Sequence, residues 1–134
     1  MNTEKKGKMK EHLGESLEDY LEAILVLSNQ LAQVRSVDVA SYLGFSKPSV
    51  SHAVKIMNEQ GLIQLDKNKC LYLSEHGEEV AKRTYRRHVF FSEMLQQIGV
   101  PKEIAQEDAC RIEHVISEET FEAIQKYYEE HEAR

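Results

Sequence analysis

The chain has 134 residues, 41% of them hydrophobic, which is enough for the core of one domain or of a small domain with an appendage. No apolar run approaches ~18 residues and the lysine-rich start lacks the apolar segment of a signal peptide, so we expect a cytoplasmic protein with no membrane partner. The two cysteines, Cys70 and Cys110, form no CxxC pair, which fits a reducing compartment and provides no disulfide framework.

The net charge of −6 is unevenly distributed along the chain. Residues 46–88 contain eight lysines and arginines against five acids, whereas the chain from residue 101 onward contains four basic residues against ten acidic ones. A local basic face can bind a phosphate backbone whatever the average charge of the protein. Composition therefore leaves two interpretations open, a DNA-binding face or solvated helix surfaces of mixed sign.

The N-terminal part is predicted to be a flexible arm followed by a helix. Residues 1–15 are polar and have no periodic apolar face. Ser16 is predicted to cap the helix, with Asp19 completing a pattern like a capping box, and the helix is expected to run to about Gln33. Its apolar residues recur at helical spacing, namely Leu17, Tyr20, Leu21, Ile24, Leu25 and Leu27.

The next two predicted helices form a helix-turn-helix. Ser36 is expected to cap the first of them, and Gly44 to end it. The second covers residues 46–61, with Pro48 in its first turn and Gly61 just past its end. An apolar face points inward and a polar face, rich in hydroxyl groups near its start, suits base edges and phosphates. An ordinary surface helix in a small bundle is the alternative.

A predicted hairpin follows, because residues 62–65 and 70–73 are rich in β-forming residues and a polar turn separates them. A helix-turn-helix followed by a hairpin with a basic tip is a winged helix, although a charged turn is common in any soluble hairpin. The predicted DNA-binding residues in the recognition helix and the wing are Ser46, Lys47, Pro48, Ser49, Ser51, His52, Lys55, Lys67 and Lys69.

The C-terminal part is predicted to be helical. Ser74 is expected to cap a long helix that runs to Ile98, and two further helices cover residues 102–116 and residues 117 to the end. These helices carry more apolar residues than they can bury alone, which predicts a two-fold homodimer. We therefore expect a mainly α fold with a small β-hairpin wing: a flexible arm (1–15), a winged helix-turn-helix domain (16–74) and a helical dimerisation module (75–134).

Cys110, Glu113 and His114 stand at positions i, i+3 and i+4 of the predicted helix 102–116. Helical spacing puts the three on one face, so a thiolate, a carboxylate and an imidazole can converge on one ion. Taken alone, the triplet is weak evidence for a metal site, because each of the three residues is also common on an amphipathic helix.

Five motifs occur in the order in which one protein family has them. They are Glu18-Asp19-Tyr20-Leu21-Glu22, Ser46-Lys47-Pro48-Ser49-Val50-Ser51, Leu73-Ser74-Glu75-His76-Gly77, Arg87-His88 and the segment from Cys110 to Ser117. On these motifs the chain, from Ser16 to about Glu132, resembles the metal-dependent regulators of the diphtheria toxin repressor family, in the short manganese-regulator form without an SH3-like domain. The resemblance implies a metal site formed by Asp19, Glu22, His88, Cys110, Glu113 and His114.

The implied ligand set mixes two branches of that family. The manganese regulators often carry glutamate where this chain has Cys110, and the iron-responsive members carry methionine where it has Asp19. The glutamate and histidine of the ancillary site in the iron branch correspond here to Ser92 and Gln106. We expect Mn²⁺ as the cofactor, with Fe²⁺ as the alternative, and the sequence leaves open whether one or two ions bind per subunit.

The resemblance implies a divalent-metal-dependent transcriptional repressor that binds double-stranded operator DNA and controls genes of manganese or iron homeostasis. A metal-independent winged-helix regulator that responds to a small organic effector is the alternative. The sequence offers no glycine-rich loop and no pair of nucleophile and base, so we expect neither an enzyme nor an organic substrate.

Overall fold

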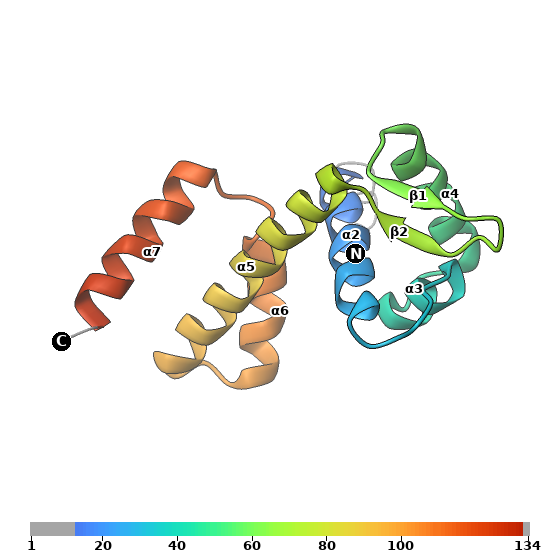
Figure 1. Cartoon of the computed structure of the whole chain (residues 1–134). Coiled ribbons are helices and arrows are strands. Elements are labelled where there is room, and N and C mark those ends of the chain that lie inside the picture. The colour runs from blue at the N-terminus through green and yellow to red at the C-terminus, as the bar shows by residue number, and fades with distance from the viewer. Residues whose placement is uncertain (1–12, 133–134) are drawn as a thin grey trace. The chain divides into compact units, whose positions relative to one another are not determined.

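The computed structural model describes residues 13–132, which fall into two compact units (Figure 1). The boundary between the units lies between Arg83 and Thr84, inside the long helix α5 (Glu75–Gln97), whereas the predicted domain boundary lies at the start of that helix. Within residues 13–132, no helix is long and apolar enough to cross a membrane.

Helix α2 (Leu13–Ser28) begins earlier and ends earlier than predicted. Ser16 lies inside the helix, so the prediction that it is the N-cap is wrong, and residues 13–15 of the expected arm are helical, whereas residues 1–12 lie outside the described part. A serine inside a helix costs only a few tenths of a kcal/mol, which makes it a weak boundary signal. The helix stops at Ser28 because its apolar stripe ends at Leu27, and residues 28–33 are exposed.

Helices α3 (Ser36–Leu43) and α4 (Lys47–Glu59) form the predicted helix-turn-helix. The N-cap of α3 is Arg35 rather than Ser36, because the Asp38 carboxylate accepts the Arg35 N–H at 2.9 Å and fixes the start of the helix one residue earlier. Gly44 ends α3 in the left-handed conformation (φ 74°), where a side chain would be strained. In the turn, the Phe45 ring packs edge-on against Tyr20 of α2.

The end of α4 and the wing follow from backbone hydrogen bonds. Leu62 N–H donates to the Met57 carbonyl and Gly61 N–H donates to the Asn58 carbonyl, which is a Schellman motif with Gly61 at φ 75°. Strands β1 (Ile63–Leu65) and β2 (Leu71–Leu73) then pair antiparallel, with Gln64 opposite Tyr72. Each strand is one residue shorter at its start than the predicted run.

Ser74 caps α5, as predicted, and also ties this helix to the end of α4. Its hydroxyl donates to the Gly61 carbonyl at 2.7 Å and accepts the Gly77 N–H at 3.0 Å. A Cβ at Gly77 would overlap the Leu62 carbonyl oxygen, so the first turn of α5 can pack here only with glycine. The core of this unit combines apolar residues of α2, α3, α4, the hairpin and the first turns of α5, among them Leu21, Ile24, Val39, Val50, Met57, Ile63, Leu71 and Ala81.

In the second unit, the later turns of α5 pack with α6 (Lys102–Ile112) and α7 (Glu118–Glu132). The buried core is formed by Phe91, Ala109 and Phe121, one from each helix. Phe90 adds edge-to-face contacts with Phe91, Phe121 and Tyr128, at centroid distances of 5.2–5.7 Å. Helix α6 ends four residues before the predicted Ile116, which changes how the candidate ligands are held.

Candidate metal centre and nucleic-acid interface

The outward face of α4 begins with two serines that are hydrogen-bonded to each other. The Ser46 hydroxyl caps the helix by accepting the Ser49 N–H at 3.3 Å, and it also donates to the Ser49 hydroxyl at 2.9 Å. The inward residues Val50, Ala53, Val54 and Met57 are buried, as predicted. All nine predicted DNA-binding residues in the helix and the wing are exposed.

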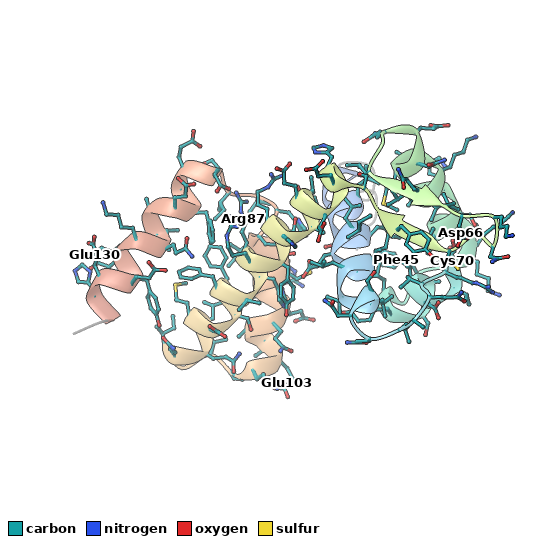
Figure 2. All side chains as sticks on the ribbon, in the orientation of Figure 1. Phe45, Asp66, Cys70, Arg87, Glu103 and Glu130 are labelled. Carbon is teal, nitrogen blue, oxygen red and sulfur yellow. The ribbon has the colours of Figure 1, made fainter. Side chains whose placement is uncertain are left out.

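The tip of the wing is held by the Asp66 carboxylate (Figure 2). Its Oδ1 accepts the N–H groups of Asn68 and Cys70, both at 2.9 Å, and its Oδ2 accepts the Tyr72 hydroxyl at 3.2 Å. The bond from the Cys70 N–H, followed by the other two, holds the pKa of the Asp66 carboxyl below its ordinary value. The wing therefore presents Lys67 and Lys69 from a fixed turn, with Lys69 in the left-handed conformation (φ 65°).

The prediction that one helix carries all three residues of the metal-ligand triplet is wrong, because α6 ends at Ile112. Cys110 lies on α6, but Glu113 is the C-cap of that helix and His114 lies in the following turn. Glu113 still has helical dihedral angles (φ −59°, ψ −21°), and its N–H donates to the Ala109 carbonyl at 3.0 Å. Because the turn continues close to helical geometry, Cys110, Glu113 and His114 still offer ligand atoms within 4.8 Å of one another.

Glu113 is the centre of this cluster, and its side chain is fully buried. Its Oε1 lies 3.0 Å from Nδ1 of His88, and its Oε2 lies 3.3 Å from Nε2 of His114. The second contact has the distance of an ion pair but not the geometry of a hydrogen bond, so Oε2 has no hydrogen-bond partner among the described residues. A buried carboxylate oxygen in this state is costly unless a cation or a proton satisfies it.

The remaining predicted ligands differ in exposure. The Cys110 residue is exposed and its thiol is not in a disulfide, so it is not the buried small hydrophobe that a structural cysteine would be. Asp19 and Glu22 lie on α2 in the first unit, three positions apart and therefore on one side of that helix, and both are half-buried.

Arg87 is a buried residue to which the sequence assigned no role (Figure 2). It lies on α5 next to His88 and donates hydrogen bonds to the segment that follows Ile112, including one to the Glu118 carboxylate at 2.7 Å. This bond lowers the pKa of the Glu118 carboxyl below its ordinary value. In the sequence, only its place in the Arg87-His88 motif indicated a role for Arg87. The charged residues around it are typical of an exposed helix face.

Two family models together match nearly the whole chain. Residues 12–71 match the N-terminal DNA-binding domain of the iron-dependent repressors, and residues 74–133 match their metal-binding and dimerisation domain. The transcriptional regulator MntR of Escherichia coli O6:H1 is 35% identical over 123 residues, which cover 92% of this chain and 79% of that protein. The HTH-type transcriptional regulator MntR of Bacillus subtilis strain 168 is 31% identical over 122 residues, covering 89% and 86% of the two chains.

The fold is similar to that of solved regulators. The manganese regulator SloR superposes with a TM-score of 0.75 at 26% identity, and the metal-dependent transcriptional regulator MtsR with a TM-score of 0.76 at 28% identity. Each match covers 84% of this chain but only 53% of the solved chain, so the chain spans about half the length of these two proteins. With both of its domains matched and relatives above 30% identity over most of their length, the chain belongs to the iron-dependent repressor family of metal-dependent transcriptional regulators.

Proposed function

We propose that this protein is a Mn²⁺-activated repressor that binds operator DNA as a homodimer and controls genes of manganese homeostasis. The observation that carries the metal part of the proposal is the buried Glu113 carboxylate, flanked by His88 and His114, with one oxygen lacking a hydrogen-bond partner in the described part of the chain. The likeness to the manganese regulator SloR supports the choice of manganese.

The chemistry of the donor set fits a divalent transition metal. The proposed ligands provide three carboxylates, two imidazoles and one thiol, from Asp19, Glu22, His88, Cys110, Glu113 and His114. Oxygen and nitrogen donors in this number suit the higher coordination of Mn²⁺ or Fe²⁺ better than the four-coordinate site that structural zinc prefers. When bound, the ion would supply a positive charge that satisfies the buried Glu113 carboxylate.

The residues of the first unit would bind the DNA. The exposed side chains of Ser49 and His52, in the N-terminal half of α4, would contact base edges, and the exposed Lys67 and Lys69 of the wing would contact phosphates. A two-fold dimer must hold two such helices about 34 Å apart to reach successive major grooves. A dimer whose domains are not fixed in that geometry has only a fraction of its population competent to bind, which lowers its apparent affinity.

The test is a fluorescence anisotropy titration of operator DNA with the chelator-treated full chain, without metal and with Mn²⁺. The operator is selected beforehand from a random-sequence DNA library in the presence of Mn²⁺. We expect weak, salt-sensitive binding in chelator and an affinity about 5- to 150-fold higher with Mn²⁺, because coupling between two sites is typically about 1–3 kcal/mol. A scrambled DNA of equal length is the control. Equal specific affinity with and without metal would overturn the proposal and favour an organic effector.

A further inference from the structure

We propose that Arg87 is a positioning residue of the metal centre, whose guanidinium holds the segment 113–118 in the shape that presents Glu113 and His114 for metal binding. This inference rests on the proposed metal-dependent function and adds to it a residue that is not itself a ligand.

The segment after α6 has little regular structure of its own. Helix α6 ends at Ile112, and the last carbonyl groups of a helix have no partners within it. The His114 N–H donates to the Arg111 carbonyl only at 3.4 Å, and the Val115 N–H donates to the Ile112 carbonyl at 3.1 Å. Val115 is 67% exposed, so burial of its side chain does not anchor the segment. The carbonyl groups of this turn therefore need donors from elsewhere.

Arg87 supplies these donors at three points. Its Nη1 donates to the carbonyl oxygens of Glu113 and Ile116, both at 3.0 Å, and its Nη2 donates to Oε1 of Glu118 at 2.7 Å. The three acceptors span the turn from its first residue to the first residue of α7. A planar guanidinium has donors on several nitrogens in a fixed fork and can bridge such acceptors. An ammonium group has all three of its donors on one nitrogen.

The guanidinium is itself firmly placed. The Arg87 side chain is only 10% exposed, and its Cζ lies 5.3 Å from the centroid of the Phe121 ring in the core of the unit. The Glu118 carboxylate balances its charge, which makes burial of the cation tolerable. A buried and packed donor limits the positions that the backbone of the turn can take.

Neighbouring residues of α5 hold Glu113 at both ends. Arg87 bonds to its backbone carbonyl, and His88 lies 3.0 Å from its side-chain Oε1. Glu113 is therefore held at its backbone and at its side chain by two consecutive residues of one helix. Without the Arg87 bond, Glu113 keeps the contact between its carboxylate and His88, but the turn that carries His114 loses the donor to its first carbonyl group. Partners that orient metal ligands in this way commonly contribute 10- to 100-fold to metal affinity.

Arg86 provides a matched control. Its Nη2 lies 3.7 Å from the other oxygen of Glu118, and its Cζ lies 5.9 Å from the Phe121 ring centroid. Its side chain is 53% exposed, however, and among the described contacts none joins it to a carbonyl of the turn. Arg86→Met therefore removes one positive charge beside Glu118 and one contact with the Phe121 ring, as Arg87→Met does. It leaves the hydrogen bonds from Arg87 to the carbonyl groups of Glu113 and Ile116 in place.

The experiment measures Mn²⁺ affinity, from the electron paramagnetic resonance signal of free Mn²⁺, for the wild-type dimer and for Arg87→Met, Arg87→Lys and Arg86→Met. Circular dichroism and gel filtration check helix content and dimer size. We expect Arg87→Met to weaken Mn²⁺ binding at least about tenfold, Arg87→Lys to lie between it and the wild type, and Arg86→Met to stay within about twofold. At saturating Mn²⁺, operator affinity of Arg87→Met should return to within about twofold of the wild type.

The outcomes separate the two proposals. A wild-type protein that does not bind Mn²⁺ contradicts the proposed function. A wild type that binds Mn²⁺ while Arg87→Met binds it equally well overturns the positioning role. The same holds if saturating Mn²⁺ fails to restore operator affinity, because the defect would then be in general stability rather than in ligand placement. If Arg87→Met does not fold, Arg87→Lys decides, and wild-type Mn²⁺ affinity in that variant counts against the role.

Discussion

Nδ1 of His88 lies 3.0 Å from Oε1 of Glu113, which joins the middle of α5 to the end of α6. A neutral histidine that donates a proton from Nδ1 carries its lone pair on Nε2, so this contact selects the tautomer in which Nε2 can bind a metal. The Glu113 carboxylate thus has two uses in one cluster. It orients His88 through one oxygen and keeps the other oxygen without a hydrogen bond in the described structure.

The first prediction concerns the effect of the buried Glu113 carboxylate on the stability of the apo protein. Glu113→Gln should abolish stabilisation by Mn²⁺ but should not lower the melting temperature of the apo protein, because it removes a buried negative charge whose Oε2 lacks a hydrogen bond. The measurement is thermal unfolding in chelator and in excess Mn²⁺. Glu107→Gln, an exposed change on α6, is the control and should keep the Mn²⁺ response. A large loss of apo stability in Glu113→Gln would show that the carboxylate serves the fold instead.

The second prediction separates DNA recognition from metal binding. Ser49→Ala and His52→Ala should leave Mn²⁺ affinity unchanged and should weaken discrimination between operator and scrambled DNA, by about 1–3 kcal/mol for each side chain that makes a good base contact. His76→Ala is the control, because His76 is an exposed histidine on the first turn of α5, outside the recognition helix. A loss of Mn²⁺ affinity in His52→Ala as large as that in His114→Ala would show that the two faces are wrongly assigned.

The helix-turn-helix and the wing could be predicted because local signals determine them. Gly44 and Gly61 both take positive φ values at helix ends, and the β-forming runs on either side of Asp66 form the hairpin. The limits of α2 were less predictable, because a serine is tolerated inside a helix and the capping pattern at Ser16 was only local. Tertiary packing, which the periodicity does not encode, decides where such a helix begins.

The candidate site was predictable to a lesser degree. Helical spacing correctly placed Cys110, Glu113 and His114 close together, although α6 ends before Glu113, because that residue keeps helical dihedral angles. The role of Arg87 could not be predicted, because a run with Arg83 and Arg86 has the pattern of a solvated face. The fold shows that Arg87, unlike Arg86, is buried against Phe121 and donates hydrogen bonds to carbonyl groups far along the chain.

The third prediction concerns the wing in acid. The hydrogen bond from the Cys70 N–H, with those from Asn68 and Tyr72, lowers the pKa of Asp66 in the folded state. The ionised Asp66 carboxylate therefore contributes fully to stability above the unfolded pKa of about 4, and this contribution is lost as the pH falls through the folded pKa. Asp66→Asn should therefore have a lower urea midpoint than the wild type at neutral pH, and the difference should shrink below about pH 4.

Urea unfolding between pH 7 and pH 3, followed by circular dichroism, measures this difference. Glu59→Gln, at the exposed end of α4, is the control and should show no comparable gap from the wild type at neutral pH. A gap between Asp66→Asn and the wild type that stays constant or widens in acid would contradict the assignment of these hydrogen bonds to the ionised carboxylate.

The fourth prediction tests the contact between α5 and the end of α4. Gly77→Ala should destabilise the first unit by about 1–3 kcal/mol, because the added Cβ meets the backbone oxygen of Leu62, which cannot rotate away as a side chain would. Glu79→Ala, an exposed change in the same turn, should remain within about 0.5 kcal/mol of the wild type. Urea titration at neutral pH measures both, and equal midpoints for the two variants would show that the packing at Gly77 is loose.

The last prediction concerns the identity of the metal. Carboxylates at Asp19 and Glu22 are hard ligands that favour Mn²⁺, whereas the Cys110 thiolate, if its sulfur binds, favours the softer Fe²⁺. Two hard ligands on α2 against one soft ligand on α6 lead us to expect Mn²⁺ as the activating ion. Cys110→Glu should then preserve or sharpen the Mn²⁺ response of DNA binding, and Asp19→Met should shift the response toward Fe²⁺. Anaerobic anisotropy titrations with each ion measure these responses, with Glu18→Met as the control for the added apolar side chain on α2. Activation of the wild type by Fe²⁺ together with no response to millimolar Mn²⁺ would reverse the assignment, because the Cys110 thiolate would then outweigh both carboxylates of α2.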